Sequence, residues 1–127
     1  MVTTGKNTIL QKMTQFVKEK NIKVLASTEV GEDSIRAIAL RDNAAFGRHR
    51  IIVDPKIVWK SSQTAYGEEQ SEFLPGVTRT VLRPKKIKVR GYTIDNKQVE
   101  VEYNDEVARY VCRAIDHLNG KTLLNLD

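Results

Sequence analysis

The sequence predicts an α+β domain with one N-terminal helix, a series of strands and one C-terminal helix. Apolar residues recur at helical spacing near both ends of the chain, in residues 8–20 and 104–120. Between these segments, short runs rich in Val, Ile and Thr alternate with turn-forming residues, as in strands joined by turns. The chain has 127 residues and no repeats, so a single domain spanning residues 1–127 is expected.

The first half of the chain is expected to hold a helix followed by short strands. Asn7 or Thr8 can cap the helix, whose apolar stripe is made of Ile9, Met13, Phe16 and Val17. The polar and acidic stretch 61–72 is expected to be a loop. Strands are expected at 22–27, 34–40, 50–53 and 56–60, with turns at 31–33 and 43–47 and a break at Asp54-Pro55.

The second half is expected to form three strands and the last helix. The strands are residues 77–82, 85–94 and 98–103, with a hairpin turn at 95–97. Asn104 is the expected cap of the helix, and Gly120 its end. The buried stripe of this helix is expected to be Val107, Val111, Ala114, Ile115 and Leu118, and a short apolar segment, residues 121–126, follows it.

The composition indicates the cellular compartment and the class of protein. No apolar run reaches membrane-spanning length, and the first residues lack the apolar middle of a secretory signal. The lone Cys112 rules out an internal disulfide and fits a reducing compartment. We therefore expect a protein without membrane contact, located in the cytoplasm, with a processed organellar form left open.

The net charge of +5 is moderate evidence for a polyanionic partner. A solvated strand face is favoured over a nucleic-acid surface, because no aromatic residue interleaves with the basic cluster. The basic cluster consists of Arg79, Arg83, Lys85, Lys86, Lys88 and Arg90.

Three stretches carry a resemblance to a known family: IIVDPKIV at 51–58, LPGVTRTVLRPKKIKVRGYTIDNKQVEVE at 74–102 and IDHLNG at 115–120. They resemble peptide deformylase, the metal hydrolase that removes the formyl group from nascent bacterial and organellar chains. The likeness runs from about Ile9 to Leu124. It implies antiparallel or mixed strands packed around a C-terminal helix that bears the metal-binding motif.

The resemblance places three family signatures on the chain. In the first, over residues 22–29, Glu29 matches the glutamine that helps to stabilise the oxyanion. In the second, over residues 69–73, Ser71 matches the cysteine that binds the metal. The third lies on the last helix, where Arg113 matches the first metal-binding histidine, Ala114 the catalytic glutamate and His117 the second histidine.

These departures predict that the family's chemistry is absent. Arginine is not a metal ligand, and a guanidinium ~4 Å from a divalent ion would repel it by about 8 kcal/mol at an effective dielectric of 20. Serine is a far weaker ligand than a thiolate. We therefore expect a chain that is not an enzyme, with no intact catalytic residue, no metal site and no cofactor.

The function expected from this interpretation is the binding of a peptide or protein partner as an added strand along the family's substrate groove. The guanidinium of Arg113 is expected to pair with Glu29, Glu69 or Glu72. The partner's identity stays open, and so does self-association. The expected groove residues are Val24, Leu25, Glu29, Ser71, Phe73, Arg113 and His117.

Two alternatives remain open. One is a ribosome- or RNA-associated protein that uses the basic cluster on phosphates. The other is a hydrolase with a non-standard site built from His117, Ser71 and nearby glutamates. His49, in an Arg-rich turn, is expected to be a surface residue.

Overall fold

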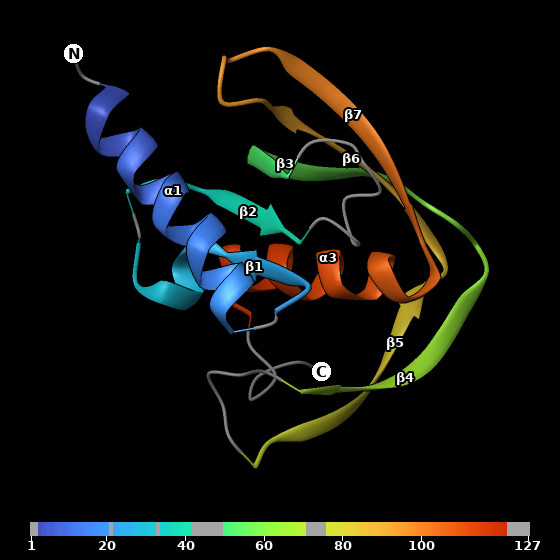
Figure 1. The fold of residues 1–127 in the computed structure, drawn as a ribbon. Coiled ribbons are helices and arrows are strands. Elements are labelled where there is room, and N and C mark those ends of the chain that lie inside the picture. Colours follow the sequence, from blue (N-terminus) through green and yellow to red (C-terminus); the bar gives the residue numbers. More distant parts are fainter. Residues whose placement is uncertain (1–2, 21, 33, 42–49, 71–75, 122–127) are drawn as a thin grey trace.

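The computed structural model describes residues 3–20, 22–32, 34–41, 50–70 and 76–121. Within these residues the chain forms two α-helices, one 3-10 helix and seven strands, which confirms the α+β class (Figure 1). In chain order, the elements are α1 (Thr3–Glu19), β1 (Val24–Ala26), the 3-10 helix η1 (Ser27–Val30), β2 (Ala37–Leu40), β3 (Ile51–Lys60), β4 (Thr64–Gln70), β5 (Thr78–Pro84), β6 (Lys86–Tyr92), β7 (Gln98–Asn104) and α3 (Asp105–Leu118).

The described strands form two antiparallel sheets that meet at a corner. Five strands pair in the order β1-β2-β3-β6-β7, and β4 pairs with β5 as a two-stranded ribbon. The hydrogen bond from Ser61 N to Lys86 O, at 2.9 Å, continues the pairing of β3 with β6, and the bond from Lys85 N to Gln63 O, at 2.9 Å, continues the pairing of β4 with β5, so one ladder follows the other around the corner. The ribbon thereby bends away from the larger sheet, and α3 lies between the two (Figure 1).

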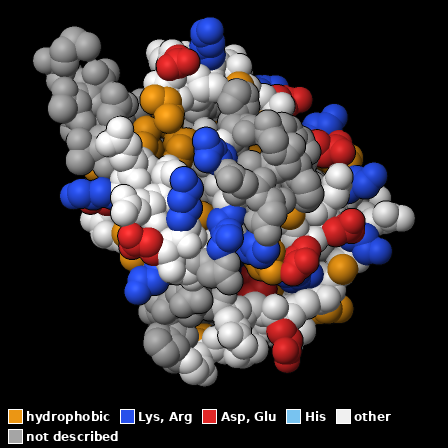
Figure 2. All heavy atoms as spheres, viewed as in Figure 1, with side chains coloured by type: hydrophobic (Ala, Val, Ile, Leu, Met, Phe, Trp, Pro, Cys, Tyr) orange, Lys and Arg blue, Asp and Glu red, His pale blue; other side chains and the backbone are white. Residues whose placement is uncertain are grey.

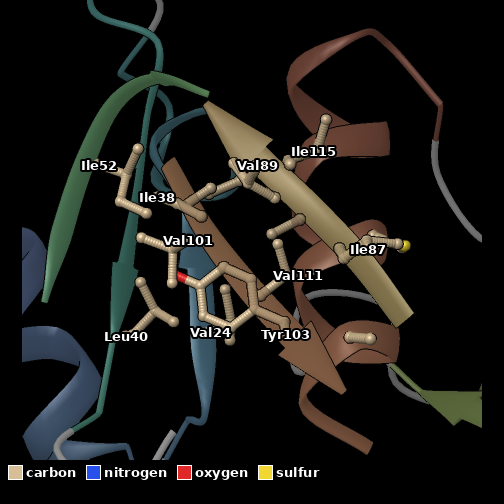
Figure 3. Close-up of a cluster of buried hydrophobic side chains, with 14 of the residues drawn as sticks. Val24, Ile38, Leu40, Ile52, Ile87, Val89, Val101, Tyr103, Val111 and Ile115 are labelled. Atoms are coloured by element: carbon tan, nitrogen blue, oxygen red, sulfur yellow. The ribbon is translucent and has the colours of Figure 1, made fainter. Parts of the chain in front are cut away.

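The five-stranded sheet is buried on both faces at β1 and β2. One face packs against α3, where Ile38, Ile52, Val89 and Val111 are fully buried (Figure 3). The other face packs against α1, and a second hydrophobic cluster forms between them. Leu10, Met13 and Val17 are the residues that α1 contributes to this cluster. Burial on both faces explains why these two strands read as continuous apolar runs rather than as alternating patterns. None of the helices in the described ranges is long and apolar enough to cross a membrane.

The structure corrects several expected elements. Helix α1 begins at Thr3, before the expected cap at Asn7 or Thr8. The expected break at Asp54-Pro55 is an irregularity inside one strand, β3, where Asp54 adopts a φ of +50° and its N–H donates to Arg36 O at 2.7 Å. The turn expected at 43–47 and the apolar segment from residue 122 onward lie outside the described residues.

The loop expected at 61–72 is wrong over residues 64–70, which form β4. Its ribbon partner β5 satisfies the backbone hydrogen bonds of this stretch. Ala65, Gly67 and Glu69 point inward while Tyr66 and Glu68 point to solvent. Because the inward residues are small or charged, the strand lacks the apolar alternation that identifies strands in a sequence.

Candidate functional site

A polar cluster lies where β1, η1 and α3 meet. The guanidinium of Arg113 donates from Nη1 to Glu29 Oε2 at 2.7 Å and from Nη2 to the Val24 carbonyl at 2.8 Å. The other oxygen of Glu29 accepts the Ala26 N–H at 2.9 Å. The side chains are 13% and 1% exposed for Arg113 and Glu29 respectively. The expected ion pair of Arg113 with a site carboxylate is therefore present, and Glu29 is its partner.

His117 lies one helical turn beyond Arg113 on α3 and joins the same cluster. Its Nδ1 is 2.7 Å from the hydroxyl oxygen of Thr28, within hydrogen-bond distance. Both side chains are partly exposed, unlike that of Glu29. The sequence did not single out Thr28, although its place next to Glu29 in the first signature was a usable signal.

Helix η1 holds Thr28 and Glu29 against α3. The Ser27 hydroxyl donates to Ile35 O at 2.6 Å and accepts the Ala37 N–H at 3.1 Å, which ties the start of η1 to β2. Gly31 ends the turn with a φ of +80°, a conformation that suits glycine. The two site residues therefore stand on a short, well-anchored turn.

A second polar network joins the β4–β5 ribbon to α3. Arg83 donates to both carboxylate oxygens of Glu69, from Nε at 3.0 Å and from Nη2 at 2.9 Å, and also pairs with Asp116. Arg109 donates to Glu69 at 2.9 Å. Burial lowers the pKa of Arg83, but hydrogen bonds to the two carboxylates raise it by more, so the guanidinium stays charged. The sequence did not identify Arg109 or Asp116 as members of this network.

The residues expected to bind nucleic acid divide between two environments. Arg83 is buried beneath the ribbon, in the network with Glu69, whereas Arg79, Lys85, Lys86 and Arg90 are exposed and Lys88 is half-buried. Arg90 pairs with Glu100 at 3.0 Å, and the Lys88 ammonium lies 5.4 Å from the centre of the Trp59 ring. Acidic and basic side chains are interspersed over the β4–β7 part of the surface in view (Figure 2). Binding of RNA by these residues stays a prediction.

The other expected groove residues are only partly brought together. Val24 packs on the α3 side of the sheet, but Leu25 packs on the α1 side, away from Arg113. Ala114 is fully buried in the core beside α3. Ser71, Phe73 and Glu72 lie outside the described residues, and so does His49.

The described residues around Arg113 do not fit the metal site that the family resemblance implies. The parts of the chain that the structure describes contain no group of three or more His, Cys, Asp or Glu side chains placed to hold an ion. One helical turn before His117 on α3 stands the Arg113 guanidinium, which carries the same sign of charge as a metal ion.

Comparisons with known proteins agree with the fold. The family model for polypeptide deformylase matches residues 2–126. The peptide deformylase of Thermoanaerobacter pseudethanolicus is 30% identical over 129 residues, which cover 88% of this chain and 79% of that protein. A protein of Staphylococcus epidermidis named peptide deformylase-like is 30% identical over 112 residues, covering 88% of this chain and 67% of its own.

Solved structures extend the likeness to three dimensions. The class I type b peptide deformylase of Acinetobacter baumannii superimposes with a TM-score of 0.83 at 28% identity, covering 94% of this chain and 79% of its own. A peptide deformylase from the Vibrio parahaemolyticus bacteriophage VP16T gives a TM-score of 0.81 at 27% identity, covering 91% of this chain and 82% of its own. The expected peptide-deformylase-like arrangement of strands around a C-terminal helix is confirmed.

Two expectations are corrected by these comparisons. The expectation that the chain is not an enzyme is contradicted, because its relatives and structural neighbours are named as peptide deformylases, which are enzymes. The expectation of no cofactor is contradicted with it, because peptide deformylases work with a metal ion. Both expectations came from substituted residues at single positions, whereas the match extends over nearly the whole chain. By sequence and by fold, the chain belongs to the polypeptide deformylase family.

Proposed function

We propose that the protein acts on the N-terminal end of peptides, removing an N-formyl group, with the peptide held beside η1 and α3. The observation that carries this proposal is the polar cluster of Thr28, Glu29, Arg113 and His117, which occupies the signature positions of a family whose model matches residues 2–126. The relatives named peptide deformylase supply the substrate class.

The cluster has the groups that bind an amide carbonyl. Arg113 carries five N–H donors, of which two are accounted for by Glu29 and the Val24 carbonyl. His117 uses one ring nitrogen toward Thr28, and its second ring nitrogen can exchange a proton with water or with a leaving amine. In formamide hydrolysis, water adds to the formyl carbon, the C–N bond breaks, and formate and a free amine form. The positive charge of the Arg113 guanidinium stabilises the negative charge that develops on the formyl oxygen.

The first experiment measures turnover and binding together. Purified protein is incubated with the N-formyl-Met-Ala-Ser peptide, without oxygen, either without added metal or with iron(II), nickel(II), cobalt(II) or zinc(II). Formate and free amine are quantified, and binding is followed by changes in the NMR spectrum. Formate and amine released in equal amounts support the proposal; neither release nor binding under any condition overturns it.

A matched pair of variants tests the role assigned to His117. His117→Asn keeps a polar atom near the position that bonds Thr28 and removes the second ring nitrogen. We expect it to lower formate release at least tenfold, within the range for loss of a proton-transferring group. Gln98→Ala, at an exposed position on β7, is the control and is expected to leave the rate unchanged. Equal rates for all three proteins would contradict the role of His117.

A further inference from the structure

Strand β1 stands at the edge of the five-stranded sheet. Among the described strands it pairs only with β2, with Leu25 opposite Ala39. The Arg41 N–H donates to Lys23 O at 2.9 Å, so the backbone of Lys23 faces β2. By the alternation of an antiparallel pair, Leu25 also faces β2, whereas the N–H and C=O groups of Val24 and Ala26 face away from it. These are the groups to which a further strand bonds.

Two of these outward groups are already bonded, and both to side chains of the cluster. The Val24 carbonyl accepts the Arg113 N–H at 2.8 Å, and the Ala26 N–H donates to Glu29 at 2.9 Å. Arg113 and Glu29 are joined to each other at 2.7 Å. The pair thus offers one N–H donor and one oxygen acceptor, two residues apart along the edge. A neighbouring strand presents the same pair of groups to an edge.

We propose that the Arg113–Glu29 pair is a removable side-chain substitute for a β-strand, and that an extended peptide replaces it on the edge of β1. The peptide then donates a backbone N–H to the Val24 carbonyl and accepts the Ala26 N–H. The pair acts as a lock that sets how tightly such peptides bind. This inference rests on the proposed function, because the ligand is the same peptide.

The Arg113–Glu29 pair is held by few hydrogen bonds, which allows a ligand to separate it from the strand edge. Glu69, in the ribbon network, is held by two arginines, Arg83 and Arg109, through three hydrogen bonds. Glu29 is held by one arginine and one backbone N–H. The pair contacts the strand edge through two bonds, from Arg113 to the Val24 carbonyl and from the Ala26 N–H to Glu29, so a peptide backbone can replace both at once. The partly exposed Thr28 and His117 lie beside the pair.

The test removes both charges together, because a single removal leaves a buried charge unpaired. In the double variant Glu29→Met, Arg113→Met, hydrogen exchange at the Ala26 amide is followed with and without N-formyl-Met-Ala-Ser peptide. We expect that amide to exchange at least tenfold faster than in the unaltered protein, and the peptide to restore its protection. Peptide affinity is expected to rise at least tenfold. The control variant Arg90→Met, Glu100→Met removes an exposed pair and is expected to change neither quantity.

The outcomes separate the lock from the proposed function. If the unaltered protein binds or hydrolyses the peptide and the double variant binds no more tightly, with Ala26 still unprotected, the lock alone is overturned. If neither protein binds or hydrolyses the peptide, the proposed function falls and the lock with it. Arg113→Lys serves if the double variant does not fold: lysine reaches Glu29 or the Val24 carbonyl but does not fork between them, so a smaller gain in affinity is expected.

Discussion

At the scale of single residues, Tyr110 gives the clearest electrostatic signature. Its hydroxyl donates to Glu106 at 2.6 Å, one turn earlier on α3. This hydrogen bond, together with partial burial, raises the pKa of Tyr110 to about 12. The neutral phenol is the form that donates to the carboxylate, so folding favours the protonated side chain.

The sign of the pH dependence follows from this shift. The contribution of Tyr110 to stability is fully present below its unfolded pKa of about 10 and is lost as the pH rises toward about 12. We expect the difference in unfolding free energy between the protein and its Tyr110→Phe variant to shrink over that range. Urea unfolding at several pH values measures it, with Glu106→Gln as the control that moves the phenolate titration back toward 10. A difference that stays constant between pH 10 and 12 would refute the assignment.

At the scale of elements, the contact of β4 with α3 depends on Gly67. A Cβ atom at this position would lie 2.7 Å from Arg109 Cζ and 2.8 Å from Arg109 Nε. The same guanidinium donates to the carbonyls of Ala65 at 2.7 Å and Val81 at 2.9 Å. Helix α3 is thus fastened to both strands of the ribbon through a space that only glycine leaves free.

We predict that Gly67→Ala destabilises the protein by about 1–3 kcal/mol, the usual range for overpacking, because three hydrogen bonds keep the Arg109 guanidinium from moving aside. Urea unfolding measures the loss. The same substitution in an Arg109→Ala background is expected to cost much less, because the side chain that the new methyl group meets is gone. Equal losses in the two backgrounds would show that Arg109 is not the source of the strain.

The elements differ in how far the sequence predicts them. Helix α3 and strands β6 and β7 are found because their apolar residues repeat at the spacing of a helix or a strand. Strand β4 is missed because its inward residues are Gly67, Ala65 and the charged Glu69, whose burial depends on Arg83 and Arg109 from other elements. The spacing of apolar residues in the sequence therefore does not predict the buried polar network beneath the ribbon.

The sequence likewise predicts some contacts of the candidate site and misses others. The pairing of Arg113 with a carboxylate is predicted because the family signatures bring acidic residues to its site, but the structure shows that Glu29 is the partner among the three candidates. The bond between Thr28 and His117, and the place of Arg109 and Asp116 in the ribbon network, depend on how η1 and the ribbon dock on α3. Docking of this kind is a property of the assembled fold, which local spacing does not encode.

At the scale of the whole molecule, β1 and β2 couple the two hydrophobic clusters. Neighbouring residues of one strand belong to different clusters: Ala37 and Ala39 contact the α1 side, and Ile38 and Leu40 the α3 side. Loss of either cluster would expose one face of the strands that complete the other. Cooperative unfolding of the whole chain follows from this arrangement.

We therefore predict that the far-ultraviolet circular dichroism and the fluorescence of Trp59 change in one transition during urea unfolding. Trp59 is the only tryptophan and lies on β3, in the sheet that both helices cover. The variant Leu10→Ala removes a side chain of α1 that is 2% exposed and packs against the sheet. It is expected to lower the urea midpoints of the circular dichroism and fluorescence transitions equally. A loss of helix signal ahead of the fluorescence change would show that α1 unfolds separately.

The edge contacts of Arg113 and Glu29 also bear on the history of the chain, through the order in which two substitutions can arise. Each side chain has one backbone partner that does not depend on the other, the Ala26 N–H for Glu29 and the Val24 carbonyl for Arg113. A glutamate introduced first at position 29 would nevertheless place an unpaired carboxylate in a site that is almost closed to water, with 1% of the side chain exposed, whereas the side chain of Arg113 is 13% exposed. The route through Arg113 first thus avoids the less stable intermediate. We expect the evolutionary intermediate to have carried Arg113 together with a neutral residue at position 29.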